Sequence, residues 1–258
     1  MEHFSSEQKE TGMRPGLRAF LGTVLGIALF FTAALVMGDE FTQTIASKTL
    51  ATFDDSANNA NWIVQGSKYA TQGFPQMQLV HAWPEALYGK NRDNKPLFAL
   101  GVHGKFDRKS YNYIEMIPAA KDSSGKLQPQ GIPIPGRVKS INMWVWGANY
   151  NYTLDAHIRD YQGIDHVLHL GSLLFAGWRD LGAAISGAIP QSRPYIPKYA
   201  GLELTKLVIW TAPDEKVDDF YFFIDEITVI TDLFETRFDG EDLADPVTLN
   251  SLWQQGTK

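Results

Sequence analysis

Two tryptophans in the segment 141–160 have polar and titratable residues as close neighbours in the sequence. Gly147-Ala148-Asn149 is typical of a turn between two strands, because Gly and Asn suit positive φ. In a hairpin the aliphatic residues of both strands share the core side, and alternation puts the indoles and the polar residues on the other side. The candidate residues for contact with a protein partner or a glycan are Asn142, Trp144, Trp146, Asp155, His157 and Arg159.

Paired aromatic rings among hydrogen-bonding groups stack on sugar rings or anchor protein interfaces. The alternative is that the chain itself covers the two indoles, as happens to most large aromatic side chains. The proline-rich loop 186–198 is a candidate for such a cover. The sequence leaves both interpretations open for Trp144 and Trp146.

No catalytic or metal-binding spacing is present among the titratable residues. A G-x-S-x-G elbow, a P-loop and a G-x-G-x-x-G loop are all absent. His166 and His169 are three residues apart, which on a strand places them on opposite faces and argues against a shared metal. A glycosidase would need two carboxylates about 5–10 Å apart across a cleft, and a sequence does not reveal such a pair. We therefore expect a protein without catalytic activity, cofactor or metal, and keep an exported glycan-processing enzyme as a weaker alternative.

Strands must hold the candidate residues in place. After residue 39 short runs alternate apolar and polar residues between Gly, Pro, Asn and Asp, and no segment keeps a 3.6-residue period. Many short strands between turns predict an all-β fold, a jelly-roll β-sandwich. Loops are expected at 119–136 and 186–198. The expected strands span 50–53, 77–83, 97–106, 111–117, 138–146, 150–159, 166–170, 178–185, 202–211 and 220–231.

The segment 220–231 is mostly apolar on both faces, which is typical of a central strand covered on both sides. Asp225 interrupts it, in phase with Tyr221 and Phe223. We expect Asp225 to be a buried structural acid that hydrogen-bonds the backbone of a neighbouring loop.

Composition and charge exclude some classes of function. The 258 residues are 44% hydrophobic and 20% charged, which is ordinary for a globular protein. With a net charge of −6, the chain lacks the overall positive charge that is typical of nucleic-acid-binding proteins. With no cysteine, the chain has no disulfide, thiol nucleophile or thiolate metal site.

The N-terminal segment has the layout of an export signal. The uncharged stretch 19–37 follows Arg14 and Arg18, and small residues precede Asp39. The alternative is an uncleaved membrane anchor, because such a stretch could just span a bilayer. We favour cleavage, which leaves an exported, periplasmic or extracellular protein with no stable membrane anchor.

Three regions are therefore expected. Residues 1–38 form the signal peptide, residues 39–232 the jelly-roll domain, and residues 233–258 an acidic tail with a short helix. Asp245-Pro246 is typical of an N-cap followed by the first residue of that helix. The tail either docks on a partner or lies across its own domain.

Two long motifs resemble a known family. "IPIPGRVKSINMWVWGANYNYTLDAHIRDYQGIDHVLHLGSLLFAGWRDL" and "IPQSRPYIPKYAGLELTKLVIWTAPDEKVDDFYFFIDEITVITDLFE" resemble the outer-layer (sheath) protein of spirochaete periplasmic flagellar filaments. The earlier "LATFDD", "GFPQMQLV" and "KSYNYIEMIP" are similar to it as well. The resemblance covers most of 50–235 and leaves out the leader and the acidic tail.

The resemblance implies an exported, non-catalytic subunit whose domain is similar to the jelly rolls of carbohydrate-binding modules. Its partners would be flagellin core subunits, other sheath subunits and like copies along the filament, with no nucleic acid. Its role would be to stiffen and shape the filament in the periplasm, and so to affect motility. The alternative is an exported carbohydrate-binding module that recognises a cell-wall or flagellin-linked glycan through Asn142, Trp144 and Trp146.

Overall fold

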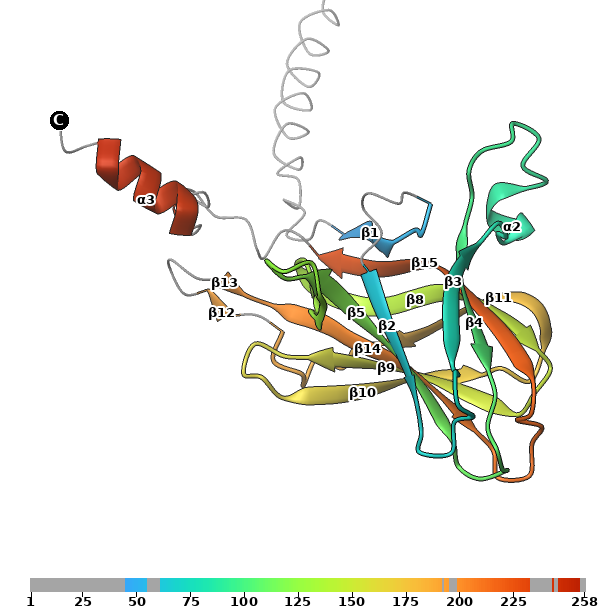
Figure 1. The fold of residues 1–258 in the computed structure, drawn as a ribbon. Coiled ribbons are helices and arrows are strands. Elements are labelled where there is room, and N and C mark those ends of the chain that lie inside the picture. The colour runs from blue at the N-terminus through green and yellow to red at the C-terminus, as the bar shows by residue number, and fades with distance from the viewer. Residues whose placement is uncertain are drawn as a thin grey trace, which may run out of the picture. The chain divides into compact units, whose positions relative to one another are not determined.

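The computed structural model describes residues 45–54, 61–191, 193–194, 199–232, 243 and 246–255 (Figure 1). In this part of the chain, two antiparallel sheets enclose one hydrophobic core and form an all-β sandwich. Sheet A has the order β11-β8-β15-β4-β3, and β1 also pairs with β15. Its strands are β1 (Ile45–Ala51), β3 (Gln76–Val80), β4 (Ala99–Gly104), β8 (Arg137–Ala148), β11 (Ala176–Ala184) and β15 (Phe220–Asp232).

Sheet B has the order β10-β9-β14-β5-β2, with β6 paired to β5 and β7 paired to β14. Its strands are β2 (Asn61–Gly66), β5 (Tyr113–Lys121), β6 (Leu127–Pro129), β7 (Ile132–Ile134), β9 (Tyr152–Arg159), β10 (Asp165–Ser172) and β14 (Leu202–Thr211). The short strands β12 (Arg193–Pro194) and β13 (Tyr199–Ala200) pair with each other. Two helices lie within the described residues: α2 (Glu85–Tyr88), between β3 and β4, and α3 (Pro246–Gln255).

Alternation along the strands builds the core. In β9, the side chains of Leu154, Ala156 and Ile158 are fully buried and their neighbours are partly or fully exposed. In β8, Met143 and Val145 are buried in the same way. β8 and β9 therefore each have one apolar face toward the shared core and one outer face that is partly exposed.

A bulge in β15 reverses the alternation of that strand. Glu226 has a φ of 46°, and the pairing of β15 with β8 shifts between Asp225 and Thr228. Before the bulge Phe222 is an inward residue, and after it Ile227 is. The extra residue thus keeps apolar side chains on the core side along the whole strand.

Asp225 is buried, as the sequence predicts, and its Oδ1 accepts a hydrogen bond of 2.8 Å from the N–H of Glu226. The donor therefore belongs to the bulge of the same strand and not to a neighbouring loop. The expectation that β15 is covered on both sides is wrong at Tyr221, because this residue is 47% exposed.

The expected strands are present with shifted ends, and the main corrections concern short elements. The expected loop 119–136 contains β6 and β7, which extend sheet B. β2 was not expected from the sequence. Part of the expected loop 186–198 forms β12.

The signal peptide expected at 1–38 lies outside the described residues. Of the acidic tail, Leu243 and helix α3 are described, and α3 begins at Pro246. None of the helices in the described ranges has the length and hydropathy needed to cross a bilayer.

Candidate functional site

The segment 141–160 crosses from one sheet to the other and does not form a hairpin. β8 pairs with β11 and β15 in sheet A, whereas β9 pairs with β10 and β14 in sheet B. Asn149 has a φ of 63° at the connection, so the turn lies where the sequence places it. The aliphatic residues of both strands face the core as expected, and their other faces therefore point to opposite sides of the sandwich.

This crossing divides the candidate residues into two groups, so the prediction that they share one surface is wrong. Asn142, Trp144 and Trp146 lie on the outer face of sheet A, and Asp155, His157 and Arg159 lie on the outer face of sheet B. A hairpin and a crossing between sheets give the same alternation of buried and exposed residues, which is why the sequence did not separate them.

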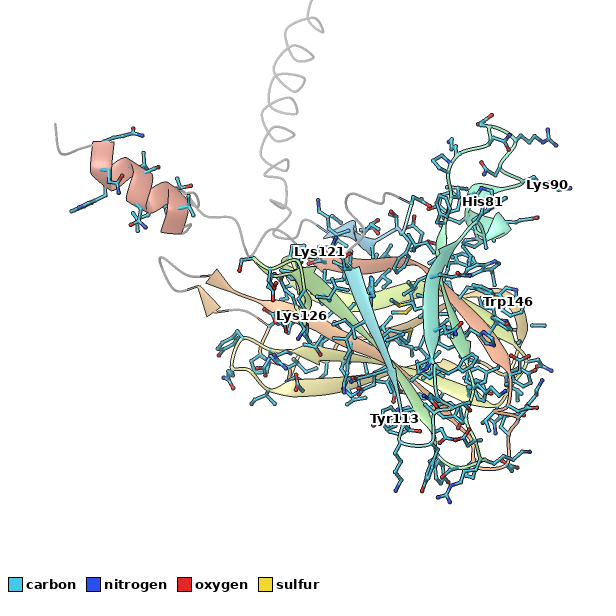
Figure 2. The ribbon with its side chains drawn as sticks, in the orientation of Figure 1. His81, Lys90, Tyr113, Lys121, Lys126 and Trp146 are labelled. Carbon is cyan, nitrogen blue, oxygen red and sulfur yellow. The ribbon has the colours of Figure 1, made fainter. Side chains whose placement is uncertain are left out.

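A cross-strand row of rings lies on the outer face of sheet A. Trp146 pairs in register with Trp178 of β11 on one side and with Phe223 of β15 on the other. Its ring meets Phe223 at a centroid distance of 5.4 Å and an angle of 69°. Figure 2 labels Trp146 at this place. We call this surface the aromatic face; its rings are those of Trp144, Trp146, Trp178, Tyr221 and Phe223.

The two predicted tryptophans are partly exposed in this face. Their side chains are therefore neither buried in the core nor fully exposed to solvent. Trp178 and Phe223 were missed as members of the face because strand pairing brings them there from distant parts of the chain. The alternation within 178–185 and 220–231 was visible in the sequence, but the order of the strands was not.

Asn142 is fixed on the aromatic face by polar neighbours. Its Oδ1 accepts a hydrogen bond of 3.2 Å from the Ser140 hydroxyl. Burial raises the pKa of Asp180, and a hydrogen bond from Asn142 opposes that rise. The amide lies over Gly182, where a Cβ would come within 2.3 Å of Asn142 Nδ2. Asn142 is thus positioned by β11 and not free to reorient toward a ligand without breaking these contacts.

A groove of about 420 Å³ lies beside Phe223 on the same face. Tyr221 stacks on His103 at a centroid distance of 4.0 Å and an interplanar angle of 18°. His103 Nε2 contacts Asp219 Oδ1 at 2.6 Å, which anchors the stack. The residues that line the groove are Gln76, Met77, Gln78, Val80, Gly101, Val102, His103, Tyr221 and Phe223.

The groove offers both hydrogen-bonding groups and an aromatic ring to a ligand. Gln76 and Gln78 supply amide donors and acceptors, and Tyr221 supplies a partly exposed ring. Gly101 leaves room for the Phe223 and Val80 side chains at the base of the groove, because a Cβ there would lie 3.0 Å from the Phe223 ring and 3.2 Å from Val80. The sequence did not identify this groove.

Charge pairs occupy the outer face of sheet B. Asp155 Oδ1 contacts His169 Nδ1 at 2.8 Å, and Arg159 donates to Asp165 at 3.0 Å. Further along the sheet, the Lys206 ammonium contacts Glu115. We call this surface the charged face; its residues are Glu115, Asp155, His157, Arg159, Asp165, His169 and Lys206.

His157 and Glu115 have shifted pKa values at the centre of the charged face. Burial and then the Lys206 ammonium lower the pKa of His157, and nearby carboxylates oppose this only in part. Burial tends to raise the pKa of Glu115, but hydrogen bonds from Lys206 and Gln65 outweigh it and leave that pKa lowered. The face therefore holds a neutral imidazole beside an ion pair at neutral pH.

The histidines of β10 lie on opposite sides of that strand, as their spacing predicts. His166 Nε2 contacts the buried carboxylate of Asp160 at 2.8 Å, and His169 contacts Asp155 on the charged face. In the described part of the chain, no three His, Asp or Glu side chains are grouped as a ready-made metal site.

Comparison with known proteins adds a family match. The model of the family described as flagellar filament outer layer protein FlaA matches residues 37–239. A relative in Brachyspira hyodysenteriae, described as a flagellar filament outer layer-like protein, is 23% identical over 145 residues, which cover 56% of this chain and 62% of that protein. The chain thus matches less than two thirds of that relative's length.

Solved structures that resemble the sandwich include carbohydrate-binding modules. A family 61 module in complex with β-1,4-galactotriose is 14% identical, with a TM-score of 0.35, and the match covers 67% of this chain and 89% of the module. A family 11 module of a cellulosomal cellulase of Clostridium thermocellum is 12% identical, with a TM-score of 0.39, and the match covers 73% of this chain and 96% of the module.

Proposed function

The chain belongs to the flagellar filament outer layer protein family, and on that premise we propose that it is a structural sheath subunit of the periplasmic flagellar filament. It is exported, loses its signal peptide and coats the flagellin core, where it contributes to stiffness, shape and motility. The observation that carries this proposal is the family match over 37–239, which includes both sheets of the sandwich.

The geometry of the sandwich suits a subunit that touches more than one neighbour. Its two outer faces point in opposite directions and differ in chemistry, one aromatic and one charged. Contacts made by unlike surfaces propagate along a filament, whereas contacts between like surfaces close into a dimer. We propose that the aromatic face is a contact surface for another filament subunit, since aromatic residues concentrate binding energy at protein interfaces.

No step of this proposal requires catalysis. A sheath subunit works by adhesion, through packing and hydrogen bonds to flagellin core subunits, other sheath subunits and like copies. Neither a nucleic acid nor a stable membrane anchor is part of the proposal.

The first experiment tests the location of the protein. Purified periplasmic filaments from the native cell are analysed by mass spectrometry next to the remaining envelope fractions. We expect the chain in the filament fraction at a ratio to flagellin that is constant between preparations. If the protein is absent from filaments and abundant in another envelope fraction, the proposed function is wrong.

The second experiment tests the aromatic face with matched variants. Trp146→Ala removes a ring of the aromatic face, and Trp210→Ala removes a ring that is 37% exposed on sheet B. Both proteins should fold, which circular dichroism checks. We expect Trp146→Ala to reduce co-sedimentation with the filament and Trp210→Ala to leave it near the parent value. Co-sedimentation of Trp146→Ala at the parent level would contradict the role given to the aromatic face.

The groove on the aromatic face favours a second candidate function, the binding of a cell-wall or flagellin-linked glycan. Its amides and its partly exposed Tyr221 ring suit a sugar that stacks and hydrogen-bonds. A glycan array should lose signal on Tyr221→Ala, because this ring lines the groove. No binding of any sugar at millimolar concentration would reject this candidate without affecting the first.

A further inference from the structure

Strand β3 forms an open edge of sheet A. Among the described residues its strand partner is β4 alone, and the two pair from Gln76–His103 to Val80–Ala99 without a register shift. Figure 1 shows β3 at the rim of the sheet, beyond β4. Every second residue of an edge strand directs its N–H and C=O away from the sheet, where another strand can pair with them.

β3 lacks the features that normally protect such an edge. Its sequence, QMQLV, contains no charge and no proline, and its pairing has no bulge. Natural proteins usually place these features on edge strands, because an unprotected edge pairs with other chains. By contrast, β11 at the opposite edge of sheet A carries Arg179 and Asp180, and β10 in sheet B carries Asp165 and a register shift before Gly171.

The hydrophobic core extends out to this edge. Leu79 of β3 continues a cross-strand row with Leu100 of β4 and Ile224 of β15. The exposed fraction along the row is 0% at Ile224, 3% at Leu100 and 41% at Leu79. β2 is also an edge strand without charge, but its Trp62 is only 6% exposed. The apolar side of β3 is therefore the part of the core rim that is left open.

We propose that β3 pairs with β3 of a second copy of this chain, antiparallel and centred on Gln78. In this register Gln78 faces Gln78, Met77 faces Leu79, and Gln76 faces Val80. On the core side, Met77 of each copy covers Leu79 of the other. On the outer side, the two Gln78 amides lie directly opposite and can donate to and accept from each other.

A second β3 fits this edge better than the other edge strands of a neighbouring copy do. β11 would bring Arg179 and Asp180, and β10 would bring Asp165, against a strand that has no charge to pair with them. A contact between identical strands closes into a dimer. The outer faces of both sheets stay free in such a dimer for other neighbours.

The pairing would also lengthen the groove on the aromatic face. Gln76, Gln78 and Val80 line the groove of about 420 Å³ from the side of β3. The same three residues of the second copy would lie across the axis, so the two grooves would adjoin. One extended ligand could then contact both copies. Dimerisation through β3 requires no filament, so it holds or fails independently of the proposed sheath role.

Sedimentation equilibrium tests the dimer. The protein is produced from the full chain, so that any processing of the N-terminal segment takes place in the cell. A five-residue edge is small for an interface, so we expect a dissociation constant of about 10–100 μM. Gln78→Lys should raise this constant about fivefold or more, because two lysines would face each other across the axis. An equal mixture of Gln78→Lys and Gln78→Glu should dimerise at least as well as the parent.

Val167→Lys is the matched control for the added charge. Val167 is 58% exposed on the edge strand β10, so a lysine there changes the net charge of the chain equally without touching β3. The dissociation constant of this variant should stay at the parent value.

Cysteine variants test the register. The chain has no cysteine, so a single introduced thiol can form a disulfide only with a second copy. Gln78→Cys should cross-link rapidly under mild oxidation, because directly opposite residues have Cβ atoms about 4.5–5.5 Å apart. Gln76→Cys is the control, exposed on the same face. The two copies of that residue would be four positions apart along the strands, about 13 Å, which is beyond the reach of a disulfide.

Each outcome decides for or against the proposal. A dimer that Gln78→Lys weakens, that the mixed variants restore and that Gln78→Cys traps supports it. A protein that stays monomeric, with equally slow cross-linking of both cysteine variants, would overturn it. So would a dimer that Gln78→Lys leaves unchanged, because the contact would then lie on another surface. If circular dichroism shows that Gln78→Lys does not fold, the difference between the two cysteine variants decides the question.

Discussion

Replacing Gly104 by alanine should destabilise the sandwich by about 3 kcal/mol. A Cβ on Gly104 would lie 2.2 Å from Phe220 Cζ, 2.5 Å from its Cε2 and 2.8 Å from Ile114 Cδ1. The Phe220 side chain is fully buried, and its ring centroid lies 4.9 Å from that of Tyr152 and 6.1 Å from that of Phe106. The ring can therefore move only by displacing other core side chains. Overpacking a filled core costs about 1–3 kcal/mol, and three contacts below 3.0 Å place this case at the upper end.

Urea unfolding followed by tryptophan fluorescence measures the cost. For a sandwich of this size we expect the midpoint of Gly104→Ala to fall by about 1 M or more. Gly187→Ala is the matched control, because a Cβ there meets nothing within 4 Å and its φ is not positive. The control should stay within about 0.5 kcal/mol of the parent. A Gly104→Ala protein as stable as the control would refute the packing of β4 against Phe220 described above.

Three further changes test the two outer faces and the core. Gly182→Ala would bring a Cβ within 2.8 Å of the Ile141 carbonyl oxygen and displace Asn142, so urea unfolding should show a loss of about 1 kcal/mol or more; a gain in stability would contradict this. Because burial and Lys206 hold the pKa of His157 below 6.5, stability should be full above that value and fall as the pH drops through the folded pKa. The His157→Gln protein should therefore lose less stability than the parent protein when the pH is lowered from about 7 to about 5. An equal loss in both proteins would count against this role of His157. Leu154→Ala, at a fully buried position, should cost about 2–5 kcal/mol in the same assay, and a cost below 1 kcal/mol would be unexpected.

The alternation of residue types was enough to predict the long strands and their buried faces. In β8 and β9 the aliphatic residues face the core, and in β14 Leu204 and Leu207 do so as well. The sequence also placed a turn at Asn149 and a buried acid at Asp225. These features follow from local side-chain chemistry, which a sequence displays directly.

The partners of each strand could not be predicted in the same way. The alternation of apolar and polar residues predicts which face of β8 and of β9 points to the core, but it does not predict to which sheet either strand belongs. For this reason Trp146 was placed beside His157, although the two residues lie on opposite outer faces. The aromatic face and its groove depend on pairing between β3, β4, β8, β11 and β15, which are far apart in the chain.

Short elements were missed for a different reason. β6 and β7 each contain a proline, and Pro129 and Pro133 weaken the strand signal although both strands lie at the ends of the pairing in sheet B. β2 is brief, with six residues, and was not among the expected strands. The bulge at Glu226 has no signature in an otherwise regular strand, so the reversal of alternation in β15 was not visible either.

The passage of the chain from β8 into β9 has a mechanical consequence. One uninterrupted run of backbone contributes side chains to the outside of both layers. If neighbours in a filament grip the two layers, a pull between them travels through covalent bonds at this crossing. Separation of the two layers would then be resisted by this covalent link as well as by the apolar contacts between the sheets.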